Sequence, residues 1–165
     1  MTYNVKRWLV TGGGLGFAPV ASGSVGALAA IPLFLACRQL GESLYLVSMG
    51  ILLIGACAGM VWAGSWVEGV YGKDPGEAVL DEIAGLLLTF LIYHRGATWQ
   101  IVLWGYLASR FFDIIKIPPA RQMERIRGGW GILLDDLISS AYAGVALHLA
   151  HRIAPDIGLG SWMDV

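Results

Sequence analysis

A long stretch without any charged residue constrains this chain more than any other feature of its sequence. Residues 44 to 67 contain no Asp, Glu, Lys or Arg and include four glycines. A helix needs about 20 apolar residues to cross the hydrocarbon core of a bilayer. A domain of 165 residues has little core in which to hide so long an apolar helix. The stretch therefore predicts a membrane-spanning helix, and Gly50, Gly55, Gly59 and Gly64 favour close packing against other helices.

The composition of the whole chain agrees with a membrane protein. Hydrophobic residues make up 56% of it and charged residues 14%, whereas a soluble domain usually carries about 25% charged residues. Seven tryptophans are typical of a chain that lies at membrane interfaces. The net charge of −1 provides no basic field, so no nucleic-acid partner is expected. Both cysteines lie in apolar runs and are expected to be small buried side chains.

Four further apolar segments accompany the charge-free stretch, and no run shows the strict alternation of a strand. We therefore predict an all-α fold: a polytopic membrane helical bundle of about four to five membrane segments, in a single domain over residues 1–165. A glycine-rich N-terminal loop over residues 11–26 precedes most of the first segment. A four-span variant, in which residues 24–38 are re-entrant, is the alternative. The additional segments cover residues 24–37, 77–93, 99–116 and 134–151.

The distribution of basic residues predicts the orientation. With the N-terminus in the cytoplasm, seven of the 11 Lys and Arg residues lie on the cytoplasmic side and three outside, as the positive-inside rule favours. The glycine-rich loop, the acidic ends of three segments and the basic loop 116–130 then meet at the cytoplasmic face. Charges at membrane depth usually face the protein interior and serve a function, so we expect a functional site at that face.

Acidic residues supply the first candidates for chemistry. Asp81 and Glu82 begin one segment, Asp113 ends the next, and Asp135 and Asp136 begin the last. Neighbours on a helix point about 100° apart, so one member of each adjacent pair can reach a shared site while the other pairs elsewhere. Carboxylates from different helices suit Mg²⁺, whereas helix capping and the helix dipole are the structural alternative.

Basic residues could either stabilise this face or bind an anion. Arg110, Asp113 and Lys116 follow one another at spacings of three, which predicts an ion-pair ladder or a phosphate-binding face. Arg125 and Arg127 lie in the following loop, where arginine binds a phosphate or an anionic lipid headgroup.

Two glycine-containing segments complete the set of candidates. Gly23 and Ser24 lie in the N-terminal loop, and Gly128 and Gly129 precede the last segment. Such backbones can direct N–H groups at an anion, and close helix packing is the alternative.

Six blocks of the sequence form a recognisable series. In chain order they are Gly14-Leu-Gly-Phe-Ala-Pro19, Ser22-Gly-Ser-Val-Gly26, Asp74-Pro75, Asp81-Glu82-Ile-Ala-Gly85, Ser109-Arg-Phe-Phe-Asp-Ile-Ile-Lys116 and Gly128-Gly-Trp-Gly-Ile-Leu-Leu-Asp-Asp136. In this order they resemble the phosphatidylglycerophosphatase A family over about residues 12 to 145. The chain departs from the family pattern at several positions, among them Ser24 in place of Thr and Ser139-Ser140 in place of an Ala-Gly pair.

The resemblance implies a Mg²⁺-dependent enzyme of phospholipid synthesis. It would be a multi-pass protein of the inner (cytoplasmic) membrane, with its site on the cytoplasmic face. Its substrate would be phosphatidylglycerophosphate, hydrolysed to phosphatidylglycerol and phosphate. Another lipid phosphomonoesterase, or a non-catalytic lipid-binding or ion-conducting membrane protein, is the alternative. The expected metal ligands are Asp81, Glu82, Asp135 and Asp136; the expected catalytic residues are Asp81, Glu82, Arg110, Asp113 and Lys116; the expected substrate-binding residues are Gly23, Ser24, Arg127, Gly128 and Gly129.

Overall fold

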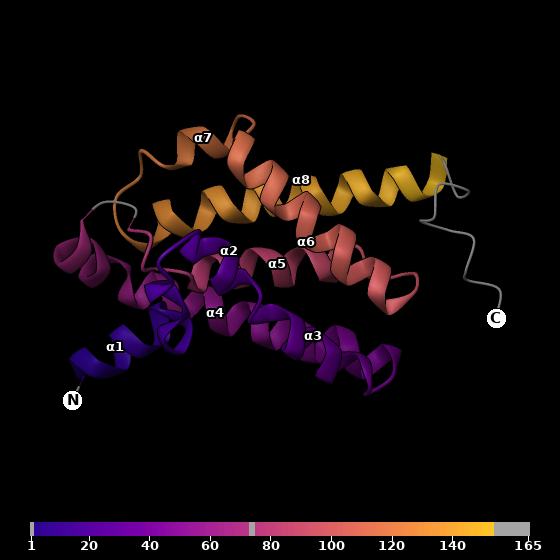
Figure 1. The fold of residues 1–165 in the computed structure, drawn as a ribbon, viewed down its shortest axis with the longest axis horizontal. Coiled ribbons are helices and arrows are strands. Elements are labelled where there is room, and N and C mark those ends of the chain that lie inside the picture. The colour runs from indigo at the N-terminus through magenta and orange to yellow at the C-terminus, as the bar shows by residue number, and fades with distance from the viewer. Residues whose placement is uncertain (1, 73–74, 154–165) are drawn as a thin grey trace.

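A computed structural model describes residues 2–72 and 75–153, and in this part of the chain all regular elements are helices, without a strand (Figure 1). The all-α prediction is confirmed. The elements are α1 (Thr2–Val10), the 3-10 helix η1 (Gly12–Phe17), α2 (Ser22–Ala27), α3 (Ala30–Arg38), α4 (Glu42–Tyr71), α5 (Leu80–Ile92), α6 (Thr98–Ile115), α7 (Ala120–Met123) and α8 (Gly129–Ile153).

Two described helices, α4 and α8, are long and apolar enough to cross a membrane, which is fewer than the four to five segments predicted. The difference arises because an apolar run in the sequence is not always a helix over its full length. The run at 77–93 contains a helix of only 13 residues, α5, which is about 20 Å long. The run at 24–37 is divided between α2 and α3, and α6 carries several polar side chains within its 18 residues.

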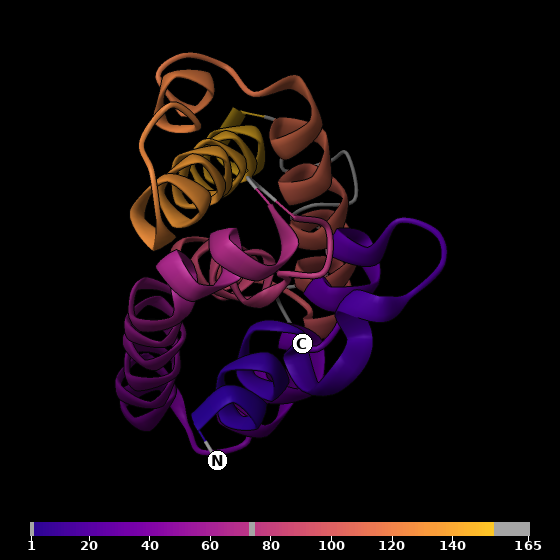
Figure 2. The ribbon, with the colours of Figure 1, turned by 90° about the vertical axis from the view of Figure 1, so that its left-hand side faces the viewer.

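The short helix α5 forms the centre of the molecule and packs against α8, α4, α2, α6 and α3. Most of its side chains are buried, and Leu86 and Phe90 are fully so. The Phe90 ring lies against the Phe34 ring of α3, with centroids 4.6 Å apart. Figure 2 views the bundle from one end, with α7 and the start of α8 on one side and the N-terminal helix on the other.

Glycines allow α4 and α8 to cross at close range. A Cβ at Gly64 would overlap the backbone of Gly129, and a Cβ at Gly129 would overlap the Met60 carbonyl. The sequence predicts close packing for all four α4 glycines, but at Gly50 and Gly55 an added Cβ would meet no atom of another described helix within 4 Å. The prediction is therefore wrong for these two, because they lie on a face of α4 that no other described helix covers.

The end of the bundle away from the acidic residues is held by one arginine. The Arg38 guanidinium donates to the carbonyls of His94 and Gly96, both at 2.8 Å, and to Thr98 Oγ1 at 3.1 Å. These bonds fix the end of α3 to the loop between α5 and α6. The contact satisfies backbone carbonyls just after the end of α5. The acidic residues lie at the opposite end of the bundle.

Candidate active site

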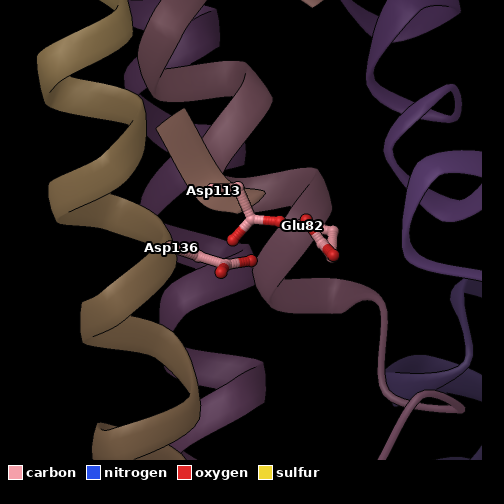
Figure 3. A group of neighbouring side chains, drawn as sticks. All are labelled: Glu82, Asp113 and Asp136. Atoms are coloured by element: carbon pink, nitrogen blue, oxygen red, sulfur yellow. The ribbon is translucent and has the colours of Figure 1, made fainter. Parts of the chain in front are cut away.

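Three carboxylates from three helices meet at one end of the bundle. Glu82 lies in the first turn of α5, Asp113 in the last turn of α6 and Asp136 near the start of α8. One oxygen of each carboxylate lies within 4.8 Å of the others, and the side chains point toward one another (Figure 3). Residues separated by 54 positions in the sequence thus form one acidic group, as the alternating directions of the segments predicted.

Arg110 is the counterion of this group. Its guanidinium forms an ion pair with Glu82 and a second, at 3.4 Å, with Asp113 one turn further along α6. The residue is only 9% exposed, and its Nε has no hydrogen-bond partner among the described residues. If Glu82, Asp113 and Asp136 are all ionised, three negative charges face one positive charge, and the group has a net charge of −2.

Buried carboxylate oxygens without donors indicate that a cation fits here. Asp136 Oδ2 and Asp81 Oδ1 are buried and have no hydrogen-bond partner within the described residues. Such atoms are costly to bury unless a positive charge compensates them. Carboxylates alone, with no sulfur or imidazole ligand in the group, are the donor set that Mg²⁺ prefers. Asp81 lies outside this group of three.

Lys116 holds a second, adjacent network. Its Nζ donates to Asp135 and to Glu124, each at 2.7 Å. Lys116 caps α6 in a left-handed conformation (φ 48°), which separates it from the helical ladder through Asp113 that the spacing predicted. Burial lowers the pKa of Lys116, but the hydrogen bonds to the two carboxylates outweigh it and hold the pKa above its ordinary value.

The two adjacent aspartates of α8 therefore serve different partners. Asp135 is bound to Lys116, and Asp136 belongs to the acidic group with Glu82 and Asp113. The 100° between neighbours on a helix produces this division. Asp135 as a metal ligand remains a prediction.

The N-terminal loop reaches the acidic group through Gly23. A Cβ at Gly23 would overlap Glu82 Oε1, so the absence of a side chain lets α2 approach this carboxylate. The neighbouring Ser24 contributes its carbonyl, which accepts a hydrogen bond from the Tyr106 hydroxyl at 3.2 Å. This bond attaches the loop to α6. Both residues thus lie beside the site, and their role in substrate binding remains a prediction.

The second glycine segment has a different environment. Gly128 (φ 76°) and Gly129 are buried, and both lie against α4 at the helix crossing. This contact supports the packing alternative for these two glycines. The neighbouring Arg127 is exposed. The Asp74-Pro75 block falls partly outside the described residues, because Asp74 is not among them.

Comparison with known proteins identifies the family. The sequence model of the family described as phosphatidylglycerophosphatase A matches residues 8–151. The chain belongs to the phosphatidylglycerophosphatase A family. All three carboxylates of the acidic group and Arg110 lie inside the matched residues. Family membership makes the chain an enzyme, a lipid phosphatase that acts on phosphoric monoesters.

Curated relatives agree with this assignment. A protein of Escherichia coli (strain K12) named phosphatidylglycerophosphatase A is 30% identical over 151 residues, which cover 90% of this chain and 86% of that protein. A Haemophilus influenzae protein of the same name is 30% identical and covers 87% of each chain. A Bacteroides thetaiotaomicron protein with the provisional name phosphatidylinositol-3-phosphatase is 32% identical, covering 87% of this chain and 91% of that protein. No solved structure matches this chain.

The candidates drawn from the sequence did not include two residues that are linked to them, Glu124 through Lys116 and Ser139 through its position on α8. Glu124 shares Lys116 with Asp135, and no helical periodicity relates positions 116 and 124 across the loop. Ser139 is fully buried, and its Oγ has no hydrogen-bond partner among the described residues. Its spacing of three from Asp136 was the available signal, since it places both residues on the same side of α8.

Proposed function

We propose that this chain hydrolyses phosphatidylglycerophosphate to phosphatidylglycerol and phosphate, with Mg²⁺ held by Glu82, Asp113 and Asp136. The observation that carries the proposal is the meeting of three carboxylates around Arg110 in a member of this family. The net charge of −2 on the ionised group matches one divalent cation.

The residues around the group suit the cleavage of a phosphomonoester. Mg²⁺ bound there would polarise the phosphoryl group as a Lewis acid. Arg110, which pairs with Glu82, would donate to a phosphoryl oxygen and neutralise the charge that develops during cleavage. Asp81, whose buried Oδ1 has no described partner, would accept the proton of the attacking water. Lys116 would act through Asp135, keeping the start of α8 in place beside α6.

Exposed apolar stripes support a location in a membrane. On α4, Leu44, Val47, Ile51 and Ile54 recur at helical spacing and are each more than half exposed. Only 17% of the most apolar window of α4 is buried, which is unlike the core helix of a soluble protein. We infer that lipid covers this face in a multi-pass protein of the inner membrane. The basic residues near the acidic group favour the cytoplasmic side for the site.

One relative points to a second candidate substrate. The provisional name of the Bacteroides protein refers to a phosphatidylinositol that bears a phosphomonoester at position 3. The same acidic group and arginine would serve that cleavage, because the reacting phosphomonoester is the same chemical group. The two substrates differ only in the alcohol that leaves.

Phosphate release from purified protein in uncharged nanodiscs tests the proposal. Phosphatidylglycerophosphate, phosphatidic acid and phosphatidylinositol 3-phosphate are compared, each with Mg²⁺ and with a chelator. The Glu82→Gln and Asp136→Asn variants are expected to lose at least about 100-fold in kcat. Glu42→Gln, an exposed acid at the start of α4, is the matched control and retains the parent rate.

The outcomes separate the parts of the proposal. Mg²⁺-dependent release that is fastest with phosphatidylglycerophosphate and lost in both variants supports it. Faster release from phosphatidylinositol 3-phosphate would favour the second candidate. Full activity in both variants would refute the carboxylate assignment, and full activity with the chelator would refute the metal. Mn²⁺ binding followed by electron paramagnetic resonance checks the ligands without turnover.

A further inference from the structure

A basic pocket lies on the segment that joins α6 to α8 and includes α7. Its volume is about 460 Å³, within the usual range for ligand sites. Pro118, Arg121, Gln122, Glu124 and Arg125 line it. None of these residues belongs to the machinery described above, except that Glu124 shares Lys116 with Asp135.

The pocket is fixed to the bundle at several points. Ala120, in the helix that forms its floor, is fully buried. The Tyr142 hydroxyl of α8 donates to the Pro118 carbonyl at 3.0 Å, and Lys116 Nζ bonds to Glu124 at 2.7 Å. The walls are therefore held from both α6 and α8, and a ligand would meet side chains on a preformed support.

The charge in the pocket suits a singly charged anion. Among the described residues, neither Arg121 nor Arg125 forms an ion pair, and both are exposed. Glu124 is engaged by Lys116. The lining thus carries two positive charges and one negative, a net charge of +1. Arginine binds phosphate oxygens through paired N–H groups, which makes a phosphate diester with its single charge the matching ligand class.

One lysine connects this pocket to the reacting end. Lys116 touches Glu124 on the pocket wall and Asp135, whose neighbour Asp136 belongs to the acidic group. The pocket and the acidic group are thus linked through Lys116 and the two aspartates of α8. The acidic group with Arg110 suits a phosphomonoester together with a divalent cation, and the pocket suits a diester without one.

We propose that the Arg121–Arg125 pocket binds the phosphodiester of the lipid substrate while its terminal phosphomonoester lies at Arg110. This inference rests on the proposed function, because phosphatidylglycerophosphate carries both groups, joined by one glycerol. Phosphatidic acid carries a phosphomonoester but no diester. The pocket therefore selects lipids in which a headgroup separates two phosphates, and Arg121 and Arg125 are specificity-determining residues.

Binding of a diester lipid without a phosphomonoester tests the pocket apart from turnover. Dihexanoyl phosphatidylglycerol is titrated by calorimetry into the full chain in an uncharged detergent, and inorganic phosphate is titrated separately. The variants are the double substitution Arg121→Gln/Arg125→Gln and, as control, Arg95→Gln, which removes an exposed charge at the opposite end. Thermal unfolding verifies that each variant is folded, and the KM for phosphatidylglycerophosphate is measured in parallel.

The proposal predicts that the double variant binds the short-chain lipid at least about tenfold more weakly, as expected for loss of at least one charge-assisted contact. Its KM for phosphatidylglycerophosphate rises by a similar factor. Arg95→Gln changes none of these. Three results would each overturn the proposal. The double variant could bind the lipid as tightly as the parent, the parent could fail to bind the lipid, or the variant could lose binding of inorganic phosphate alone. Lipid binding that needs the two arginines, in a parent that releases no phosphate from phosphatidylglycerophosphate, would refute the proposed function and leave the pocket standing.

Discussion

Replacing Arg110 with glutamine tests whether this side chain is the counterion that allows three carboxylates to meet. Glu82, Asp113 and Asp136 have oxygens within 4.8 Å of one another, and Arg110 contacts two of these residues. At that distance two unit charges interact by about 3.5 kcal/mol at an effective dielectric constant of about 20. Breaking a buried ion pair by removing one partner typically costs about 3–5 kcal/mol. We therefore expect Arg110→Gln to lower the free energy of unfolding by about 3 kcal/mol in a chelator.

Thermal unfolding in detergent, with chelator and with Mg²⁺, measures this effect. A loss of about 3 kcal/mol corresponds to roughly 6–12 °C in a protein of this size. A divalent cation at 100 times its Kd restores about 2.7 kcal/mol. The Arg110→Gln variant should therefore recover most of its stability in Mg²⁺, and it should gain more from Mg²⁺ than the parent gains. Arg95→Gln, at an exposed position away from the group, controls for removal of an arginine and should unfold as the parent does.

Two results would contradict this reasoning. Equal unfolding temperatures of Arg110→Gln and the parent in chelator would mean that the three carboxylates are not held together by Arg110. A variant that is destabilised but gains nothing from Mg²⁺ would mean that the acidic group does not bind the cation, even though its geometry and charge fit one.

Three further predictions concern substitutions at single positions. Gly23→Ala should lower the rate of phosphate release with little change in unfolding temperature, because the new Cβ displaces only the flexible end of Glu82. An unchanged rate would show that the approach of Gly23 to Glu82 does not matter for activity. Ser139→Ala should leave the unfolding temperature unchanged or raise it, since the buried hydroxyl has no described partner, and a clear decrease would reveal one. Gly129→Ala should lower the free energy of unfolding by about 1–3 kcal/mol or more, because the new Cβ collides with the α4 backbone. Gly55→Ala should leave it unchanged or raise it by up to about 1 kcal/mol. Equal effects of the two substitutions would argue against the close crossing of α4 and α8.

The convergence of the acidic residues was predictable from topology. Successive helices run in opposite directions, so the start of α5, the end of α6 and the start of α8 lie at the same end of the bundle. An acid placed at each of these ends must then approach the others. The helical spacing of Arg110 and Asp113 likewise predicted their contact, because residues three apart share one helix face.

The number of long helices and the partners of Lys116 were not predictable in the same way. Hydropathy measures apolar length, but α5 begins only after Val79 and ends at Ile92, so its apolar run exceeds its helix. Lys116 leaves the helical ladder because it adopts a left-handed conformation at the end of α6. Its bond to Glu124 depends on the path of the following loop, and no periodic pattern encodes that path.

The adjacent aspartates of α8 show how one short segment can serve two sites at once. Asp136 faces Glu82 and Asp113, where three negative charges meet one arginine and a net −2 remains for a divalent cation. Asp135, turned about 100° away, bonds to Lys116, which in turn holds Glu124 on the wall of the basic pocket. A displacement of the start of α8 would thus move a proposed ligand of the phosphomonoester site and an anchor of the proposed diester pocket together. Since both aspartates lie on the same turn of α8, a substitution that shifts this turn is expected to affect both proposed sites at once.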